Sequence, residues 1–282
     1  MKIGIIGFPR VGKKTIFKLL TEINIPEGPI LEATSGVAEL KDSRFDKLAA
    51  LFNPKKKTSA TVEFILFPDL DREAGQNARI YNALEGVDGI CCVVDAFGEQ
   101  SRPTDDVGTI TTELAGYPVL SQKGMVIVVN VGEKNKDEKY GKEILDKFPR
   151  LQAIPAKIEQ EISELESEEE RKTFLDEFGV KELRSEKLAG LCCQSAGFIS
   201  FFTVVKNELR QWLIKEGATV VEAAGTIHTD LARGFIRAEV MKYEDLANLG
   251  SEEAVKRAGK QLVKNKDYLV QDGDIINIRF NV

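Results

Sequence analysis

The start of the chain carries the feature that most constrains the fold, a short apolar run followed at once by a glycine-rich turn. Residues 3–6 are apolar, and the turn has the spacing G-x-x-x-x-G-K, with Gly7, Gly12 and Lys13 in its fixed positions. Such a run is typical of a strand buried in a parallel sheet, and residues 13–20 have the pattern of a helix. A glycine turn in this context predicts an α/β fold.

The same turn predicts a phosphate-binding loop. Glycines let the backbone wrap closely around phosphate oxygens, and successive N–H groups at the start of a helix attract anions. Lys13 would reach the outer phosphates of a nucleotide. The alternative is a glycine turn without a ligand. The candidate binding residues in the loop are Gly7, Arg10, Val11, Gly12, Lys13, Lys14 and Thr15.

One residue of the loop departs from the pattern. The position after Lys13 normally carries a hydroxyl that binds Mg²⁺, and here it is Lys14. Two interpretations stay open. The ammonium of Lys14 could occupy the space of the metal and make nucleotide binding independent of Mg²⁺, or Lys14 could be a solvated residue beside a vacant loop.

The first two-thirds of the chain alternate between strand-like and helix-like segments. This alternation predicts a doubly wound α/β domain with mostly parallel strands, in which ligands bind at the carboxyl ends of the strands. Gly7 and Asn130 both fall at such ends and should lie at one edge of the sheet. The strand-like segments are 61–67, 89–97, 125–131 and 151–154, and the helical ones are 42–52 and 80–84.

The sequence changes in character near Gly197. Residues 198–205 are rich in β-forming side chains, 208–217 look helical, and 274–282 form a closing strand. We therefore expect a small α+β domain at 198–282 after a larger domain at 1–197. The acidic stretch 158–178 is predicted to be a solvated helix with one packed face, and an acidic partner-binding surface is the alternative.

Composition limits the class of protein. No apolar run approaches the roughly 20 residues that span a bilayer, so we expect no membrane contact and a cytoplasmic location. The net charge of −6 argues against binding nucleic acid by bulk electrostatics, although it leaves room for a local basic patch. Neighbours in a strand point to opposite faces, so Cys91–Cys92 and Cys192–Cys193 are interpreted as buried thiols rather than disulfides or metal ligands.

The C-terminal run GTIHTDLARGFIRAEVMKYEDL closely resembles the end of the YchF GTPases, a branch of the Obg group. In that family this segment forms a TGS domain, a small β-grasp-like module. The stretches SRFDKLAALFNPKKKTSATVEF and EISELESEEERKTFLDEFGV resemble other parts of the same family. The resemblance implies a P-loop nucleotide-binding domain at 1–197, a TGS domain at 198–282, and ATP or GTP as the ligand.

The family's metal-side residues are replaced in this chain. Its loop ends G-K-S-T, so the serine becomes Lys14 while Thr15 is retained; the switch I threonine becomes Ile30. In the switch II motif D-x-x-G, the aspartate becomes Leu66 and the glycine becomes Asp69. Mg²⁺ requires oxygen ligands, so its binding is doubtful. We expect a pseudo-GTPase with little hydrolysis and no assignable catalytic residue; the alternative is an active GTPase or ATPase.

The family's base-recognition motif N-x-x-E is present at Asn130 and Glu133, which by resemblance favours ATP over GTP. Asn130 could instead bond only to loop backbone. A second base-side loop would fall at Ala156 and Lys157.

The family also carries a long coiled-coil arm, whereas only residues 99–124 connect two strands here, so we expect the arm to be absent. The resemblance further implies a regulatory protein that acts on a ribosome, RNA or protein partner through its TGS domain. A scaffold without any ligand is a third possibility. Side chains of Lys14, Ile30 or Asp69 in the phosphate space would favour it.

Overall fold

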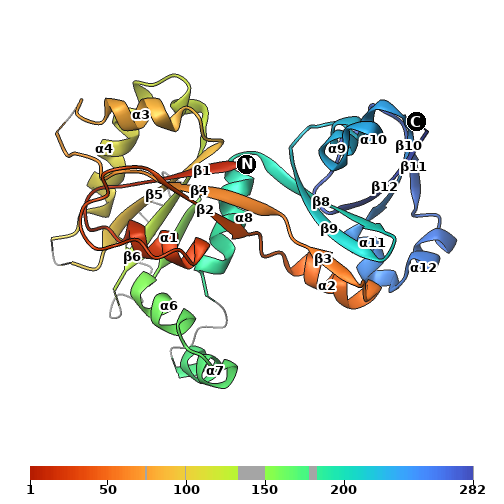
Figure 1. The fold of residues 1–282 in the computed structure, drawn as a ribbon, viewed down its shortest axis with the longest axis horizontal. Coiled ribbons are helices and arrows are strands. Elements are labelled where there is room, and N and C mark those ends of the chain that lie inside the picture. Colours follow the sequence, from red (N-terminus) through yellow and green to blue (C-terminus); the bar gives the residue numbers. More distant parts are fainter. Residues whose placement is uncertain (74, 99, 133–149, 178–182, 282) are drawn as a thin grey trace. The chain divides into compact units, whose positions relative to one another are not determined.

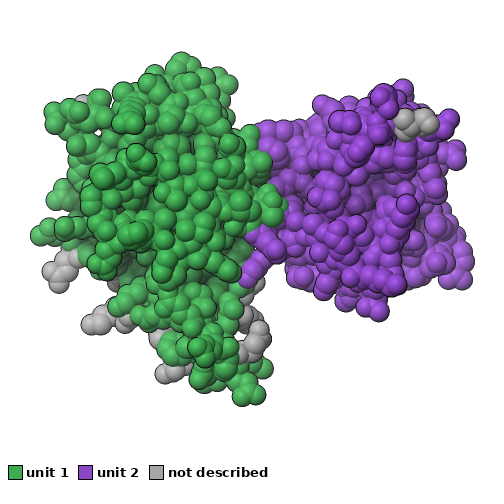
Figure 2. All heavy atoms as spheres, in the orientation of Figure 1, with its two compact units in different colours: residues 1–38, 61–196 green, residues 39–60, 197–282 purple. Residues whose placement is uncertain are grey.

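The structure, a computed structural model, describes residues 1–73, 75–98, 100–132, 150–177 and 183–281. They form two compact units, which Figure 2 distinguishes by colour. Unit 1 comprises Met1–Ala38 and Thr61–Ala196, and unit 2 comprises Glu39–Ala60 and Gly197–Val282. In the part of the chain that the structure describes, no helix combines the length and apolar character needed to cross a bilayer.

Unit 1 is built on a six-stranded sheet with the order β2-β4-β1-β5-β6-β7. Strand β1 is parallel to β4 and to β5, and β6 is parallel to β5 and to β7. The predicted α/β fold with mostly parallel strands is confirmed. The strands are β1 (Lys2–Ile6), β2 (Thr34–Glu39), β4 (Thr61–Leu66), β5 (Gly89–Ala96), β6 (Gly124–Val131) and β7 (Leu151–Ile154).

Helices cover both faces of this sheet (Figure 1). Consecutive residues of β5 from Ile90 to Val94 are all at most 1% exposed, which requires packing on both sides. Helices α4 and α8 both pack on β5, and α1 packs on α8 and α6. The helices are α1 (Lys13–Thr21), α3 (Ala78–Leu84), α4 (Pro103–Ala115), η1 (Leu120–Gln122), α6 (Ala156–Ser163), α7 (Glu168–Glu177) and α8 (Ser185–Ser195).

Two expectations about unit 1 are corrected. The acidic stretch forms two helices, α6 and α7, because the Ser167 hydroxyl accepts a hydrogen bond from the Glu170 amide (3.0 Å) and so caps a new helix. Cys192 and Cys193 lie in helix α8, not in a strand. All four cysteines are nevertheless buried thiols outside any disulfide, as expected.

The connection between β5 and β6 contains α4 and η1. Among the described residues of this connection there is no longer helix, so no coiled-coil arm projects from it.

Unit 2 contains a second six-stranded sheet, with the order β11-β10-β12-β8-β9-β3. Strand β12 runs parallel to β8, and β10 runs antiparallel to β12. Its strands are β3 (Lys56–Thr58), β8 (Phe198–Val205), β9 (Glu208–Lys215), β10 (Phe235–Lys242), β11 (Leu262–Lys264) and β12 (Asp274–Phe280). Its helices are α2 (Ser43–Phe52), α9 (Val220–Ile227), α10 (Thr229–Arg233), α11 (Tyr243–Leu249) and α12 (Glu252–Arg257).

The predicted helix at 208–217 is wrong, because this segment forms strand β9 in an antiparallel hairpin with β8. Lys206 and Asn207 have φ angles of 50° and 69°, which is the backbone of a two-residue hairpin turn. The hairpin pairs Phe201 with Trp212, and their rings stack with centroids 6.3 Å apart. Cross-strand aromatic packing of this kind stabilises a sheet.

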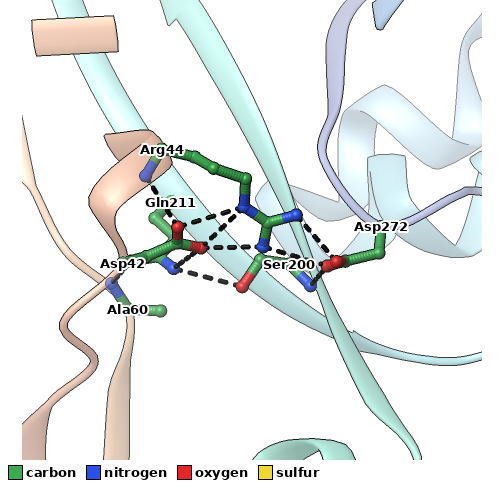
Figure 3. A network of polar contacts seen from close by, with 6 residues as sticks. All are labelled: Asp42, Arg44, Ala60, Ser200, Gln211 and Asp272. Carbon is green, nitrogen blue, oxygen red and sulfur yellow. Dashed lines mark hydrogen bonds and ion pairs between the residues drawn. The ribbon is translucent and has the colours of Figure 1, made fainter. Parts of the chain in front are cut away.

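Segment Glu39–Ala60 belongs to unit 2, whereas the sequence suggested a single boundary near Gly197. Figure 3 shows the polar network that holds it: Arg44 pairs with Asp42 (2.8 Å) and with Asp272 (2.7 Å). Gln211 donates to Asp42 and accepts from the Ala60 amide at 3.3 Å each. The apolar face of α2 completes the attachment, with Phe45 and Leu48 in a core that includes Phe202, Leu209 and Met241.

Candidate functional site

The turn after β1 contains residues with positive φ angles, a conformation that glycine adopts readily. Gly12 has a φ of 96° and Arg10 a φ of 65°, both in the left-handed region. A Cβ on Gly12 would come within 2.2 Å of the Nδ2 atom of Asn130. Glycine at this position therefore satisfies both the backbone conformation and a close approach from a neighbouring strand.

Asn130 joins the two loops that the sequence placed at one edge of the sheet. Its Nδ2 donates to the carbonyl of Val11 (3.1 Å), and its Oδ1 accepts from the amide of Ala156 (3.2 Å). Asn130 is 7% exposed, so these bonds satisfy a buried amide. Both bonds go to loop backbone, which is the alternative role that the sequence left open for Asn130, and they bring the glycine loop and the predicted base-side loop together. Glu133 lies outside the described residues.

Lys13 is buried at the base of the loop, 3% exposed. Its Nζ donates to the carbonyls of Gly7 and Phe8, the latter at 3.2 Å, and lies 2.6 Å from Oδ1 of Asp69. Burial lowers the pKa of Lys13 below its ordinary value, and the bond to Asp69 opposes that shift. An ammonium ion has three donors, so all of them are engaged by the protein.

Lys14 makes bonds that neither of its two interpretations anticipated. Its Nζ donates to the carbonyls of Pro26 (2.5 Å) and Gly28 (2.6 Å), in the segment between α1 and β2. The side chain therefore ties this segment to the start of α1. The sequence analysis named Lys14, Ile30 and Asp69 as side chains that could fill the phosphate space. Of these, Asp69 is the one that contacts the ammonium of Lys13.

The side chains at the family's metal positions do not fit Mg²⁺. Ile30 is 9% exposed and Leu66 is fully buried, both are aliphatic, and Lys14 carries a positive charge. Mg²⁺ requires oxygen ligands in octahedral geometry. Over the ranges that the structure describes, no three His, Cys, Asp or Glu side chains come close enough together to hold a metal ion.

The residues of the loop do fit a phosphate group. Helix α1 begins at Lys13, and Gly12 provides no side chain to cap it. The first amides of a helix have no intrahelical partners, so those of Lys13, Lys14 and Thr15 are donors suited to phosphate oxygens. The Asp69 carboxylate beside Lys13 is itself an anion held at this place.

Sequence reasoning identified Asp69 as a replacement for a glycine and as one of three side chains that could enter the phosphate space, but it missed the pairing with Lys13. The two residues are 56 positions apart in the chain. The pairing could have been predicted from the strand order, because Asp69 follows β4, Lys13 follows β1, and these two parallel strands are neighbours in the sheet.

A family profile named YchF-GTPase_C, described as "Protein of unknown function (DUF933)", matches residues 198–281. "Ribosome-binding ATPase YchF" of Bacillus subtilis is 30% identical over 362 residues, covering 99% of both chains. "Obg-like ATPase 1" of Oryza sativa subsp. japonica is 32% identical, covering 100% of this chain and 92% of the relative. The alignments are longer than this 282-residue chain, so the relatives contain segments without a counterpart here.

The fold is also similar to that of a solved structure. The "Structure of the Schizosaccharomyces pombe YchF GTPase" superposes with a TM-score of 0.81 at 23% identity, covering 99% of this chain and 97% of the other.

Proposed function

The chain belongs to the YchF family, and on this premise we propose that it is a nucleotide-binding regulatory protein with impaired Mg²⁺-dependent hydrolysis. The observation that carries the proposal is the combination of a retained phosphate loop with Lys14, Ile30 and Leu66 at the metal positions. Removing a group that stabilises transition-state charge costs about 10²–10³ in rate, and three positions are changed together. Binding is retained in this proposal, and hydrolysis is lost.

The glycine loop, Lys13 and Asn130 support nucleotide binding. ATP or GTP would place its phosphates against the amides at the start of α1, and its base beside Asn130 and Ala156. We favour adenine over guanine as the base, as the family's base motif suggests; Glu133 is assigned to the base only by that motif. No step of the proposed function uses Mg²⁺.

The ribosome is the partner that we propose for this chain, because relatives carry the name ribosome-binding ATPase. We propose that unit 2 contains a TGS domain and that this unit binds the partner. We also propose that the protein is cytoplasmic. Sedimentation with ribosomes through a sucrose cushion tests this assignment. Failure of the full chain to sediment with ribosomes at low salt would contradict it.

Two measurements test the nucleotide proposal. Calorimetry with ADP, GDP, ATP and GTP, first in EDTA and then in excess Mg²⁺, should show binding that does not depend on the metal. Phosphate release should stay at background, and Lys13→Ala should abolish binding because it removes the buried cation. Turnover above background that Lys13→Ala abolishes would instead support the alternative, an active GTPase or ATPase.

A further inference from the structure

We propose that Asp69 is a built-in anion at the terminal-phosphate end of the loop, and that it makes this a site for nucleoside diphosphates rather than triphosphates. This inference rests on the proposed nucleotide binding and specifies its ligand. It starts from the 2.6 Å contact between the Asp69 carboxylate and the ammonium of Lys13.

Strand order fixes the direction in which a nucleotide would lie. The sheet runs β4-β1-β5-β6, so the glycine loop after β1 has Asp69 on its β4 side and Asn130 on its β6 side. A base held beside Asn130 and Ala156 sends its phosphates toward β1 and then toward β4. The last phosphate of a triphosphate therefore arrives where Asp69 already lies.

The segment that carries Asp69 is fixed to the phosphate loop by its own backbone. The amide of Leu70 donates to the carbonyl of Gly7 at 3.1 Å. Next along the chain, the amide of Asp71 donates to Oδ1 of Asn77 (2.8 Å), and Nδ2 of Asn77 donates back to the carbonyl of Asp71 (2.9 Å). Asn77 is 2% exposed, so this pair of bonds is protected from water.

A second anchor lies three residues beyond Asp69. The guanidinium of Arg72 lies over the ring of Phe8, 4.3 Å from its centroid, and donates to both carboxylate oxygens of Asp106 (2.6 and 3.0 Å). Asp106 is 2% exposed and Phe8 belongs to the phosphate loop. These anchors at Leu70, Asp71 and Arg72 directly follow Asp69 and fix the backbone of the segment beside the phosphate loop.

The charge balance then separates the two classes of nucleotide. A diphosphate can accept the two Lys13 donors that now go to the carbonyls of Gly7 and Phe8, and Asp69 keeps the third. A third phosphate must displace Asp69 or sit beside its carboxylate, and the juxtaposition of like charges is unfavourable. The bonds that Lys14 makes to the Pro26 and Gly28 carbonyls engage two of its three donors.

Calorimetry in EDTA with GDP, GTP, ADP and ATP tests the proposal, with pyrophosphate and tripolyphosphate as probes that lack a base. The unaltered chain should bind each diphosphate at least about tenfold more tightly than the matching triphosphate. Asp69→Asn, nearly the same size without the charge, should remove that preference. Asp71→Asn removes one charge from the same segment without touching Lys13 and should preserve it.

The outcomes separate this inference from the function on which it rests. Equal affinity of the unaltered chain for diphosphates and triphosphates overturns the inference and leaves nucleotide binding standing. The inference is also overturned if Asp69→Asn keeps the full preference for diphosphates over triphosphates, provided that a cooperative thermal transition shows the variant to be folded. Absence of all nucleotide binding in the unaltered chain and in Asp69→Asn overturns the proposed function together with the inference.

Discussion

The Nδ2 atom of Asn130 lies where a side chain on Gly12 would begin, because a Cβ built there would come within 2.2 Å of it. A non-glycine residue at a φ of 96° costs about 1–3 kcal/mol in backbone strain. Gly12→Ala should reduce the free energy of unfolding by more than that, because the new Cβ also clashes with Asn130. Gly28→Ala is the matched control, with a φ of 108° and nothing within 4 Å of its Cβ. Urea denaturation should show the larger loss for Gly12→Ala; equal losses would contradict the steric role of Asn130.

Arg72 should stabilise unit 1 through the buried Asp106. Arg72→Gln removes the bonds to a carboxylate whose side chain is 3% exposed and leaves that charge without its guanidinium. Because the Arg72 side chain is itself 64% exposed, we expect a loss of about 1–3 kcal/mol in the free energy of unfolding. Arg79→Gln, an exposed arginine in α3, should cost less than about 0.5 kcal/mol. A negligible effect of Arg72→Gln would argue against the anchor.

The lysine of the loop should give anion binding a shifted pH dependence. Burial lowers the pKa of Lys13 from 10.5, Asp69 and Cys92 act in the opposite direction, and Lys14 adds to the lowering. The cation is present below this pKa and lost above it, so pyrophosphate binding should weaken at a lower pH than an ordinary lysine would give.

Asp69→Asn removes a group that raises this pKa, so the midpoint of pyrophosphate binding should move further down in pH. Calorimetry between about pH 7 and 10 measures it. A midpoint that moves up in this variant would contradict the assignment.

Lys14 should hold the segment between α1 and β2 in place. Lys14→Met keeps an unbranched side chain but loses the ammonium that bonds to the carbonyls of Pro26 and Gly28. Cleavage by a glutamate-specific protease after the exposed Glu27 should become several-fold faster, because the local opening equilibrium is shifted. Lys18→Met, one turn along the same helix, breaks an ion pair to Glu164 and should leave the rate of that cleavage unchanged.

In unit 2 the fully buried Asp274 should be the most sensitive acidic residue of the β10–β12 region. It accepts from Lys242 Nζ (2.6 Å), the Tyr268 hydroxyl (2.8 Å) and the Gln271 amide (2.9 Å). Asp274→Ala removes the acceptor of all three donors and leaves Lys242 only its bond to the Tyr268 hydroxyl (3.0 Å), so it should cost about 3–5 kcal/mol, seen by tryptophan fluorescence during denaturation. Asp267→Ala, which removes an exposed acid nearby, serves as the control. Similar midpoints for the two variants would refute the prediction.

Strands β1, β5 and β6 of unit 1 could be predicted because each is a mainly apolar run between turn signals. Strand β2 was not predicted, since its sequence TSGVAE is polar and contains a glycine. Strand β9 was mistaken for a helix because the spacing of Leu209, Trp212 and Leu213 suits both structures. The turn at Lys206–Asn207 decided between them, and neither residue is the glycine that usually marks such a turn.

The candidate site was predictable where it depends on strand ends and not where it depends on side-chain partners. The ends of β1 and β6 placed the glycine loop beside Asn130. The Lys13–Asp69 pair depends on how the segment after β4 turns back over Gly7, which no local pattern reveals. Likewise, the sequence of Glu39–Ala60 shows a helix but not the core that its apolar face joins.

The chain enters unit 2 at Glu39, returns to unit 1 at Thr61 and enters unit 2 again at Gly197, so neither unit is a continuous piece of the gene. A stop codon after Gly197 would leave Phe45 and Leu48 of α2 without Phe202, Leu209 and Met241. Conversely, a C-terminal fragment would lack α2 and strand β3 at the edge of its sheet. An expression clone of the second unit needs residues 39–60 joined to it, and a simple deletion series would damage both halves at once.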